Sequence, residues 1–267
     1  MDQIKKNFIT IARNYKSFTD KIALMYNKAN IVKKGKIREI YIPNPQLKEI
    51  QRIINKIFQA NLPKPTYLHT GYKKCRIINV LKCHKDSRLA VILDIKDFYG
   101  SVKGERIFHF LQRTCNLNVE DTKTIFKLVT YNNRLPLGLP TSNIISFWSC
   151  KEIFDDIYNY CEKLGYKFTL YADDMVISGD IKDPVNVISR VQKTLKRADL
   201  SLNYKKIKIY GKKKRIMNVH ISKNGKLSVD NKLNNAIHIL QKRDDLNEYE
   251  QRSLHGMLKY KKYIEKR

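Results

Sequence analysis

The sequence is short of acidic residues. Its 267 residues include 53 lysines and arginines but only 25 aspartates and glutamates, a formal net charge of +28. Such a surplus repels itself unless a polyanion neutralises it, so nucleic acid is the favoured partner. A Lys-, Ile- and Asn-rich composition could also reflect an AT-rich genome, but that would not explain the shortage of acids. An anionic membrane is the weaker alternative, because no amphipathic anchor flanked by Trp or Phe is present.

Long apolar runs are also missing, which excludes a transmembrane helix, and the N-terminus lacks the pattern of a signal peptide. The five cysteines are scattered, odd in number and without a C-x-x-C pair. This favours reduced thiols over disulfides or structural zinc, and Cys83-His84 is a weak metal pair with no second half nearby. We expect a soluble cytoplasmic protein.

The most informative segment is 167–178, where two short β-prone runs flank adjacent carboxylates. The pattern predicts a β-hairpin with Asp173 and Asp174 at its tip. Two adjacent carboxylates repel each other, so presenting them together suggests a divalent cation. Acidic hairpin tips are also common solvated turns, and the pair alone leaves both interpretations open.

A third acid supplies context. Asp94 follows the apolar residues Leu89–Leu93, as at the end of a buried central strand. If this strand lies beside the hairpin, three carboxylates converge, which is tenable only around cations. Oxygen ligands without His or Cys favour Mg²⁺ or Mn²⁺, and two such ions suit phosphoryl transfer. With the basic composition, this indicates chemistry on nucleic acid.

Periodicity predicts the remaining elements. We expect a basic β-hairpin over 31–43, turning near Gly35, and several short strands over 205–229. Helices are expected over residues 1–30, 47–60, 105–117, 121–131, 185–198 and 231–267, with one long helix from the loop at 135–142 to Leu164.

Five ordered motifs then make the chain recognisable. Tyr171-Ala-Asp-Asp174 resembles the Y-x-D-D box of reverse transcriptases, and the segment 93–101 resembles their D-I-x-x-F-[FY]-x-S box. The segments 135–143, 38–43 and 202–206 resemble the L-P-x-G-x-P-T-S motif, the fingers motif R-x-I-x-x-P and the motif L-N-x-K-K. The resemblance covers residues 33 to about 228.

Within that superfamily the chain is most similar to bacterial retron reverse transcriptases. His84 stands where their N-A-x-x-H motif has its histidine, although the Asn-Ala is absent, and Ile216-Met217-Asn218 replaces their V-T-G. The resemblance implies an α+β right-hand polymerase with fingers, an antiparallel palm sheet and a short helical thumb. We expect fingers over 1–85 with part of 118–146, palm over 86–117 and 147–222, and thumb over 223–267.

The resemblance also implies roles for the acids. Asp94, Asp173 and Asp174 would be catalytic and, with the backbone carbonyl of Ile95, would hold two Mg²⁺ ions, with Mn²⁺ possible. Tyr99 matches the steric gate that rejects a ribose 2′-hydroxyl, the alternative being a packed aromatic at a strand end.

Further residues are candidates for binding substrate. Gly138 would let the backbone approach the nascent base pair, the alternative being a plain Pro-Gly loop. Arg38, or secondly Arg76, would grip the triphosphate with its fork of N–H donors. Lys206 or Lys205 could protonate the leaving pyrophosphate, although a lysine in so basic a chain is often only a surface residue.

Nucleic-acid binding without sequence readout is expected of Lys212, Lys213, Lys214 and Arg215 and of the cations in the tail. The implied partners are a structured non-coding RNA as template and primer, its DNA product, dNTPs, and a separately encoded effector protein in anti-phage defence. No membrane is expected.

Two kinds of rival remain. One is another bacterial reverse transcriptase, of the group II intron type or of the abortive-infection type, which could work without a template. The other is a non-catalytic RNA-binding scaffold on a polymerase fold. Such a scaffold could lose its acids, yet Asp94, Asp173 and Asp174 are all present.

Overall fold

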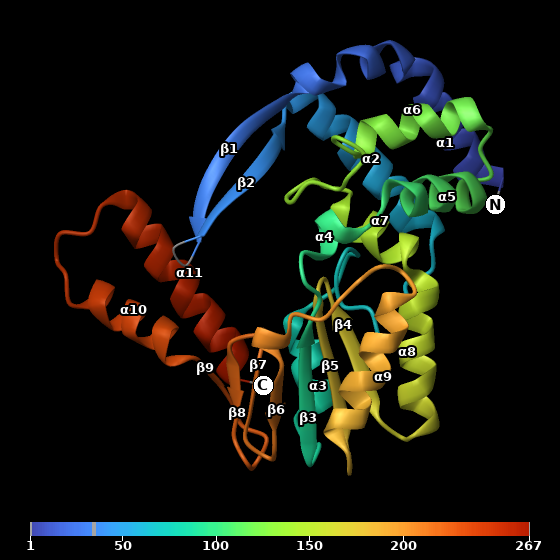
Figure 1. The fold of residues 1–267 in the computed structure, drawn as a ribbon. Coiled ribbons are helices and arrows are strands. Elements are labelled where there is room, and N and C mark those ends of the chain that lie inside the picture. The colour runs from blue at the N-terminus through green and yellow to red at the C-terminus, as the bar shows by residue number, and fades with distance from the viewer. Residues whose placement is uncertain (1, 34–35, 267) are drawn as a thin grey trace.

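The structure, a computed structural model, describes residues 2–33 and 36–266, and the side chains of residues 2 and 33–38 lie outside the described part. Its centre is a four-stranded antiparallel sheet in the order β4-β5-β3-β6 (Figure 1). The strands are β3 (Leu89–Asp94), β4 (Lys167–Tyr171), β5 (Asp174–Gly179) and β6 (Lys208–Tyr210).

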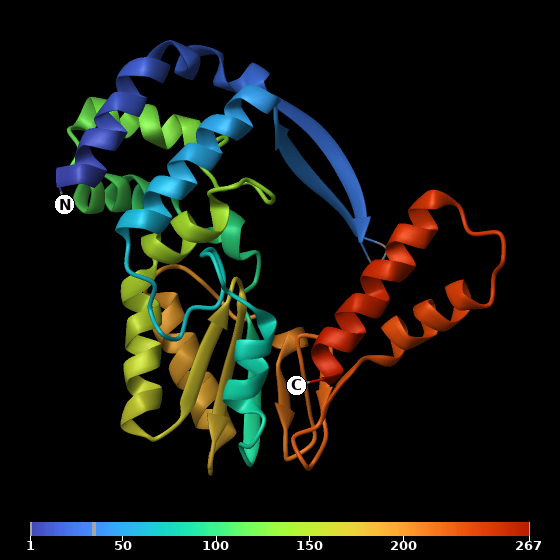
Figure 2. The ribbon, with the colours of Figure 1, turned by 180° about the vertical axis from the view of Figure 1, so that it is seen from behind.

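Helices cover both faces of this sheet, because alternate side chains of a strand point to opposite sides. Met175 and Ile177 join the main core with α8 (Lys151–Lys163) and α9 (Pro184–Lys196). Val176 instead joins a second core with residues of α3 (Ile77–His84), which lies on the opposite face (Figure 2). Strand β5 is therefore buried on both of its faces.

A helical body lies beyond the end of the sheet at which β3 stops, and a long two-stranded hairpin projects from it (Figures 1 and 2). The hairpin pairs β1 (Tyr26–Lys33) with β2 (Lys36–Pro43). The helices are α1 (Asp2–Tyr15), the 3₁₀ helix η1 (Lys16–Met25), α2 (Pro45–Asn61), α4 (Phe98–Ser101), α5 (Gly104–Cys115), α6 (Val119–Val129) and α7 (Ser142–Ser149).

The C-terminal part consists of a three-stranded sheet followed by two helices. Its elements, after the short 3₁₀ helix η2 (Tyr204–Lys206), are β7 (Lys214–Ile216), β8 (Val219–Ile221), β9 (Leu227–Val229), α10 (Asn231–Gln241) and α11 (Glu248–Glu265). The second core joins this sheet to α3 and to Ile264 of α11. Most other residues of the two helices are partly or fully exposed, so they form an open arm beside the sheet (Figure 1).

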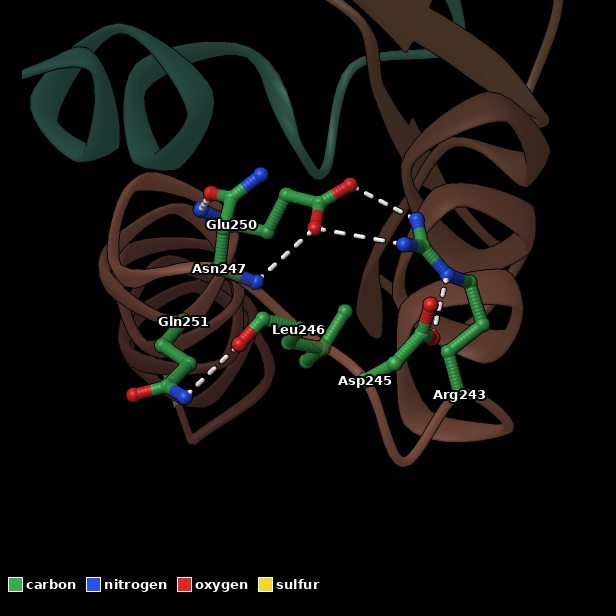
Figure 3. A network of polar contacts seen from close by, with 6 residues as sticks. All are labelled: Arg243, Asp245, Leu246, Asn247, Glu250 and Gln251. Atoms are coloured by element: carbon green, nitrogen blue, oxygen red, sulfur yellow. Dashed lines mark hydrogen bonds and ion pairs between the residues drawn. The ribbon is translucent and has the colours of Figure 1, made fainter.

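Local polar contacts close the connection between α10 and α11 (Figure 3). Asn247 and Glu250 form a reciprocal capping box at the start of α11. Arg243 forms ion pairs with Glu250 at 2.6 Å and with Asp245 at 3.2 Å. This cation of the tail is therefore engaged within the protein.

Three sequence predictions about helices are wrong in part. The helical segment expected over 231–267 is interrupted at 242–247, between α10 and α11. Residues 26–30 were expected to be helical but form β1, because Tyr26–Lys33 finds a complete antiparallel partner in Lys36–Pro43. The long helix up to Leu164 is interrupted at Cys150, since α7 packs against α2 and α5 while α8 runs along β4. The predicted turn near Gly35 lies outside the described residues.

None of the helices within the described residues is both long and apolar enough to cross a membrane.

Candidate active site

Strand register brings the three candidate acids to one end of the central sheet. Asp94, the last residue of β3, lies directly opposite Asp174, the first residue of β5. Asp173 precedes it in the turn, and its carbonyl accepts a hydrogen bond of 3.0 Å from the N–H of Ile95. The turn residues are Ala172 and Asp173, so Asp174 belongs to the strand rather than to the tip.

The Asp94 carboxylate is buried, with 5% of the residue exposed, and Nζ of Lys206 lies 2.5 Å from its Oδ2. The backbone places this lysine, because the N–H of Asn203 donates to the carbonyl of Asp94 at 2.8 Å and η2 follows directly. Lys206 therefore meets Asp94 through the local fold, with its own side chain still half-exposed.

The pKa of Asp174 reflects its position beside two other carboxylates. Burial, and then the negative charges of Asp173 and Asp94, raise the pKa of Asp174 to about 6, with Lys206 acting in the opposite direction. A group of carboxylates that resists ionisation together is stabilised by cations. This end of the sheet is electrostatically suited to positive charge.

The acids open into a cleft of about 1010 Å³. Seven of the residues predicted from sequence line it: Asp94, Ile95, Tyr99, Asp173, Asp174, Lys206 and Arg215. Sequence reasoning missed several other lining residues, namely Glu39, Asn203, Lys208, Met217 and Asn218. They come from β2, from the chain around η2, from β6 and from the turn between β7 and β8. All but Lys208 fall in the segments 38–43, 202–206 and 216–218 that were compared with family motifs, but the sequence assigned them no role.

Tyr99 stands at the wall of this cleft. Its hydroxyl donates to Oδ1 of Asn143, and the residue lines the cleft together with the acids. Burial, and then the charge of Asp173, raises the pKa of Tyr99, so the hydroxyl remains a neutral donor. Asn143 has no assigned role in the sequence, although it follows directly after the motif that contains Gly138.

The donor set fits a hard divalent cation, because it consists of carboxylate and carbonyl oxygens. As the described side chains stand, however, no three or more His, Cys, Asp or Glu residues form a group that could hold a metal ion. The ammonium of Lys206 occupies the position of a cation beside Asp94. An ion bound to Asp94 would therefore replace this contact.

Other predicted substrate residues are not among those that line the cleft. Gly138 has a φ of +94°, where glycine is favoured, and an added Cβ would meet nothing within 4 Å. Arg76 is exposed just before α3, and Lys205 is exposed in η2. Arg38 lies on β2 opposite Ile31, and its side chain is outside the described part.

The run 212–215 divides into three kinds of cation. Lys212 and Lys213 are exposed, as nucleic-acid binding requires. Lys214 is only 3% exposed, and its Nζ donates to the carbonyls of Ser87 at 2.5 Å, Lys212 at 3.2 Å and Lys85 at 3.3 Å. The phosphate-binding role predicted for Lys214 is therefore corrected to an internal one.

Arg215 lines the cleft and also forms polar contacts with Asp230 and Asn218. Its Nη2 forms an ion pair of 2.9 Å with Asp230, which also caps α10, and it contacts Oδ1 of Asn218 at 3.2 Å. Arg215 thus ties the turn at Asn218 to the first helix of the C-terminal arm.

Acidic strand ends on an antiparallel sheet, in a cleft that Lys206, Lys208 and Arg215 also line, are typical of a right-hand polymerase fold. The foamy viral protease-reverse transcriptase, solved in complex with double-stranded DNA, shares this fold with a TM-score of 0.53 at 13% identity, over 88% of this chain and 35% of that chain. Telomerase from Candida albicans, solved with a fragment of telomeric RNA, gives 0.56 at 10% identity, over 86% and 54%. The predicted fold class is confirmed.

The family model "Reverse transcriptase (RNA-dependent DNA polymerase)" matches residues 26–221, and the chain belongs to this family. It is 26% identical over 204 residues to the retron Se72 reverse transcriptase of Salmonella heidelberg (strain 579083-10), which covers 75% of this chain and 52% of that protein. It is 29% identical over 194 residues to the retron Ec73 reverse transcriptase of Escherichia coli, which covers 66% and 61%.

These matches confirm the predicted likeness to retron reverse transcriptases. The chain spans about half to three fifths of the length of these two relatives. Family membership also implies dependence on divalent metal ions in general.

Proposed function

We propose that this chain is an RNA-directed DNA polymerase of the retron type. The observation that carries the proposal is the pairing of Asp94 with Asp174, beside Asp173, at the floor of a cleft that Tyr99 and Lys206 also line. The family match and the similarity to retron enzymes support the choice of reaction.

Asp94, Asp173 and Asp174, with the carbonyl of Ile95, would hold two Mg²⁺ ions, or Mn²⁺, which when bound activate the attacking hydroxyl and stabilise the leaving phosphate. In the reaction, a primer hydroxyl loses its proton to solvent, and its oxygen forms a bond to the α-phosphorus of a dNTP as the bond to pyrophosphate breaks. Lys206, no longer held by Asp94, donates a proton to the pyrophosphate.

Selection of the nucleotide falls to the cleft wall. The ring of Tyr99, whose hydroxyl donates to Asn143, would exclude a 2′-hydroxyl by steric clash. Gly138 leaves open space for the nascent base pair, next to the cleft-lining Leu137. Arg38, Arg76 and Lys205 would contact the triphosphate after the fingers close over it.

The division into fingers over 1–85 with part of 118–146, palm over 86–117 and 147–222, and thumb over 223–267 is part of the proposal. The retron likeness supports the partners: a dedicated structured RNA, copied in part into single-stranded DNA that stays linked to it, with a 2′-hydroxyl of the RNA as a possible start. We place the protein in the cytoplasm, in anti-phage defence with a separately encoded effector.

The test is to purify the protein together with co-expressed nucleic acid, sequence what is bound, and digest it with RNase and DNase separately. A bound species with an RNA part and a covalently linked DNA part is expected. RNA alone, with no incorporation of dNTPs, would instead leave an RNA-binding scaffold. DNA made without relation to any template would favour the abortive-infection type.

A further inference from the structure

A buried polar cluster lies beneath the acidic hairpin, outside the cleft. His84, the last residue of α3, contacts Oγ of Ser178 through Nδ1 at 2.6 Å and Oγ1 of Thr169 through Nε2 at 2.8 Å. The Ser178 hydroxyl also contacts the Ser87 hydroxyl at 2.8 Å. We call these four residues the His84 cluster.

All four residues of the His84 cluster are buried. His84 is 0% exposed, so it cannot touch RNA or nucleotide directly. The apolar residues Val80, Leu81 and Val176 are buried in the adjoining core. Both ring nitrogens of His84 have a hydroxyl partner, and a hydroxyl can donate or accept, so either neutral tautomer is satisfied. A buried network of this kind specifies one arrangement of the elements that it joins.

The elements that it joins are those that carry the acids. Thr169 belongs to β4, and Ser178 belongs to β5, on the same face as Asp174 because the two are four residues apart. One imidazole therefore ties both strands of the acidic hairpin to α3, which packs against β4 and β5 (Figure 2). These contacts lie toward the base of the hairpin, with Ser178 four residues from Asp174.

Lys214 links the cluster to β7. Its ammonium donates to the carbonyl of Ser87 at 2.5 Å, directly beside the cluster, and the residue belongs to β7. Three and four residues further along, Met217 and Asn218 in the β7–β8 turn line the same cleft as the acids. Lys214 thus fixes the position of β7 relative to residues 85–87, which follow α3.

We propose, building on the proposed function, that His84 is a positioning residue for the polymerase centre. Its ring fixes β4 and β5 so that Asp173 and Asp174 face Asp94, and Lys214 fixes the β7–β8 turn relative to them. The role does not involve contact with RNA, nucleotide or primer.

The sharpest test uses isosteric changes at Thr169. Thr169→Val keeps the shape but removes the hydroxyl, and Thr169→Ser keeps the hydroxyl. At equal fraction folded, we expect Thr169→Val to lower the maximal rate of single-nucleotide incorporation about 10-fold, since small misplacements of reacting groups are costly. The Kd for dNTP should change little, and Thr169→Ser should retain the rate.

Matched controls separate positioning from stability. His84→Leu removes the network, whereas Val80→Ala opens a cavity in the same helix without touching it. At matched melting temperature, His84→Leu should lower the rate and Val80→Ala should not. Equal losses in both variants, or equal rates for Thr169→Val and Thr169→Ser, would overturn the proposal.

A readout without catalysis keeps the proposal separate from the proposed function. Amide hydrogen exchange of residues 167–179 should accelerate in His84→Leu and Thr169→Val, and less in Val80→Ala. Lys214→Met should accelerate exchange over 214–221, and Lys214→Arg should not. If the wild type incorporates no dNTP, the proposed function fails, while unchanged exchange in these variants overturns the positioning role.

Discussion

The acidic hairpin β4–β5 and the basic run 212–215 both place like charges next to one another, yet the fold treats them in opposite ways. In the hairpin, register directs Asp174 toward Asp94, and the charges are concentrated in one cleft. In the basic run, the charges are dispersed: Lys214 turns into the interior and Arg215 pairs with Asp230. The carboxylates of the hairpin thus lie together in one cleft. Lys214 and Arg215, which are neighbours on β7, point to opposite sides of the strand because successive side chains alternate.

The largest expected effect concerns the acidic hairpin. Asp173→Asn should reduce DNA synthesis about a thousandfold or more, because the site loses a carboxylate that would hold the divalent ions, and these ions would stabilise the negative charge that develops on the phosphate. Binding of RNA should remain largely intact. Rapid-quench incorporation and filter binding measure the two quantities, and equal loss of both would show that the acid is structural.

Lys206 is the cation that already sits among the acids. Lys206→Met should lower the maximal rate about 100-fold if the lysine is the general acid. Lys206→Arg should restore little, because a guanidinium does not release its proton. In the absence of dNTP, Mn²⁺ should bind Lys206→Met more tightly than wild type in an electron paramagnetic resonance titration, since the ammonium no longer competes for Asp94. An unchanged rate in Lys206→Met would contradict the assignment.

The strand alternation explains what could be predicted from sequence and what could not. The Y-x-D-D and D-I-x-x-F motifs place their acids at strand ends, so the convergence of Asp94 with the hairpin could be predicted on the condition that the two strands are neighbours. The register of Asp94 opposite Asp174 comes from the structure. The burial of Lys214 depends on carbonyls at residues 85 and 87, more than 120 positions away, and no local pattern contains them. The strand at 26–30 was missed for a similar reason, because its identity depends on its partner.

The contacts between His84 and the hairpin should make the stability of the protein depend on pH. Burial, then the charge of Lys167, with His69 and Lys214 adding to it, lowers the pKa of His84 from 6.5 to about 3. The folded state thus holds His84 neutral, and the stability that this contributes is complete above pH 6.5 and falls as the pH drops toward 3.

We therefore expect the free energy of unfolding of wild type, relative to His84→Leu, to fall by about 1.4 kcal/mol per pH unit below pH 6.5. Urea titrations at pH 7.5, 6.0 and 5.0 measure this difference, in which other titrating groups cancel. A constant difference across these three values would mean that the imidazole is not held neutral.

Tyr99 tests the wall of the acidic cleft. Tyr99→Ala should raise incorporation of rNTP relative to dNTP about 10-fold or more, because the ring no longer clashes with the 2′-hydroxyl. Tyr99→Phe keeps the ring and loses only the contact to Asn143, so its discrimination should stay close to wild type. Discrimination that Tyr99→Ala leaves unchanged would place the gate elsewhere.

The smallest expected effect concerns the basic run 212–215. Replacing Lys212 and Lys213 together by Ala should weaken RNA binding a few-fold and reduce the slope of log K against log salt by about 1 to 2. Lys214→Met should leave this slope unchanged and lower the melting temperature instead. Binding titrations at several salt concentrations decide between them, and an equal change of slope in Lys214→Met would place its ammonium on phosphate.

The central claim is that Asp94, Asp173 and Asp174 support templated DNA synthesis, and one measurement tests it most directly. The purified protein is given a defined RNA template with an annealed primer, Mg²⁺ and each dNTP singly, beside Asp94→Asn as the control. The account predicts extension only by the dNTP complementary to the template base, and none with Asp94→Asn. Extension that ignores the template, or that persists in Asp94→Asn, would contradict it.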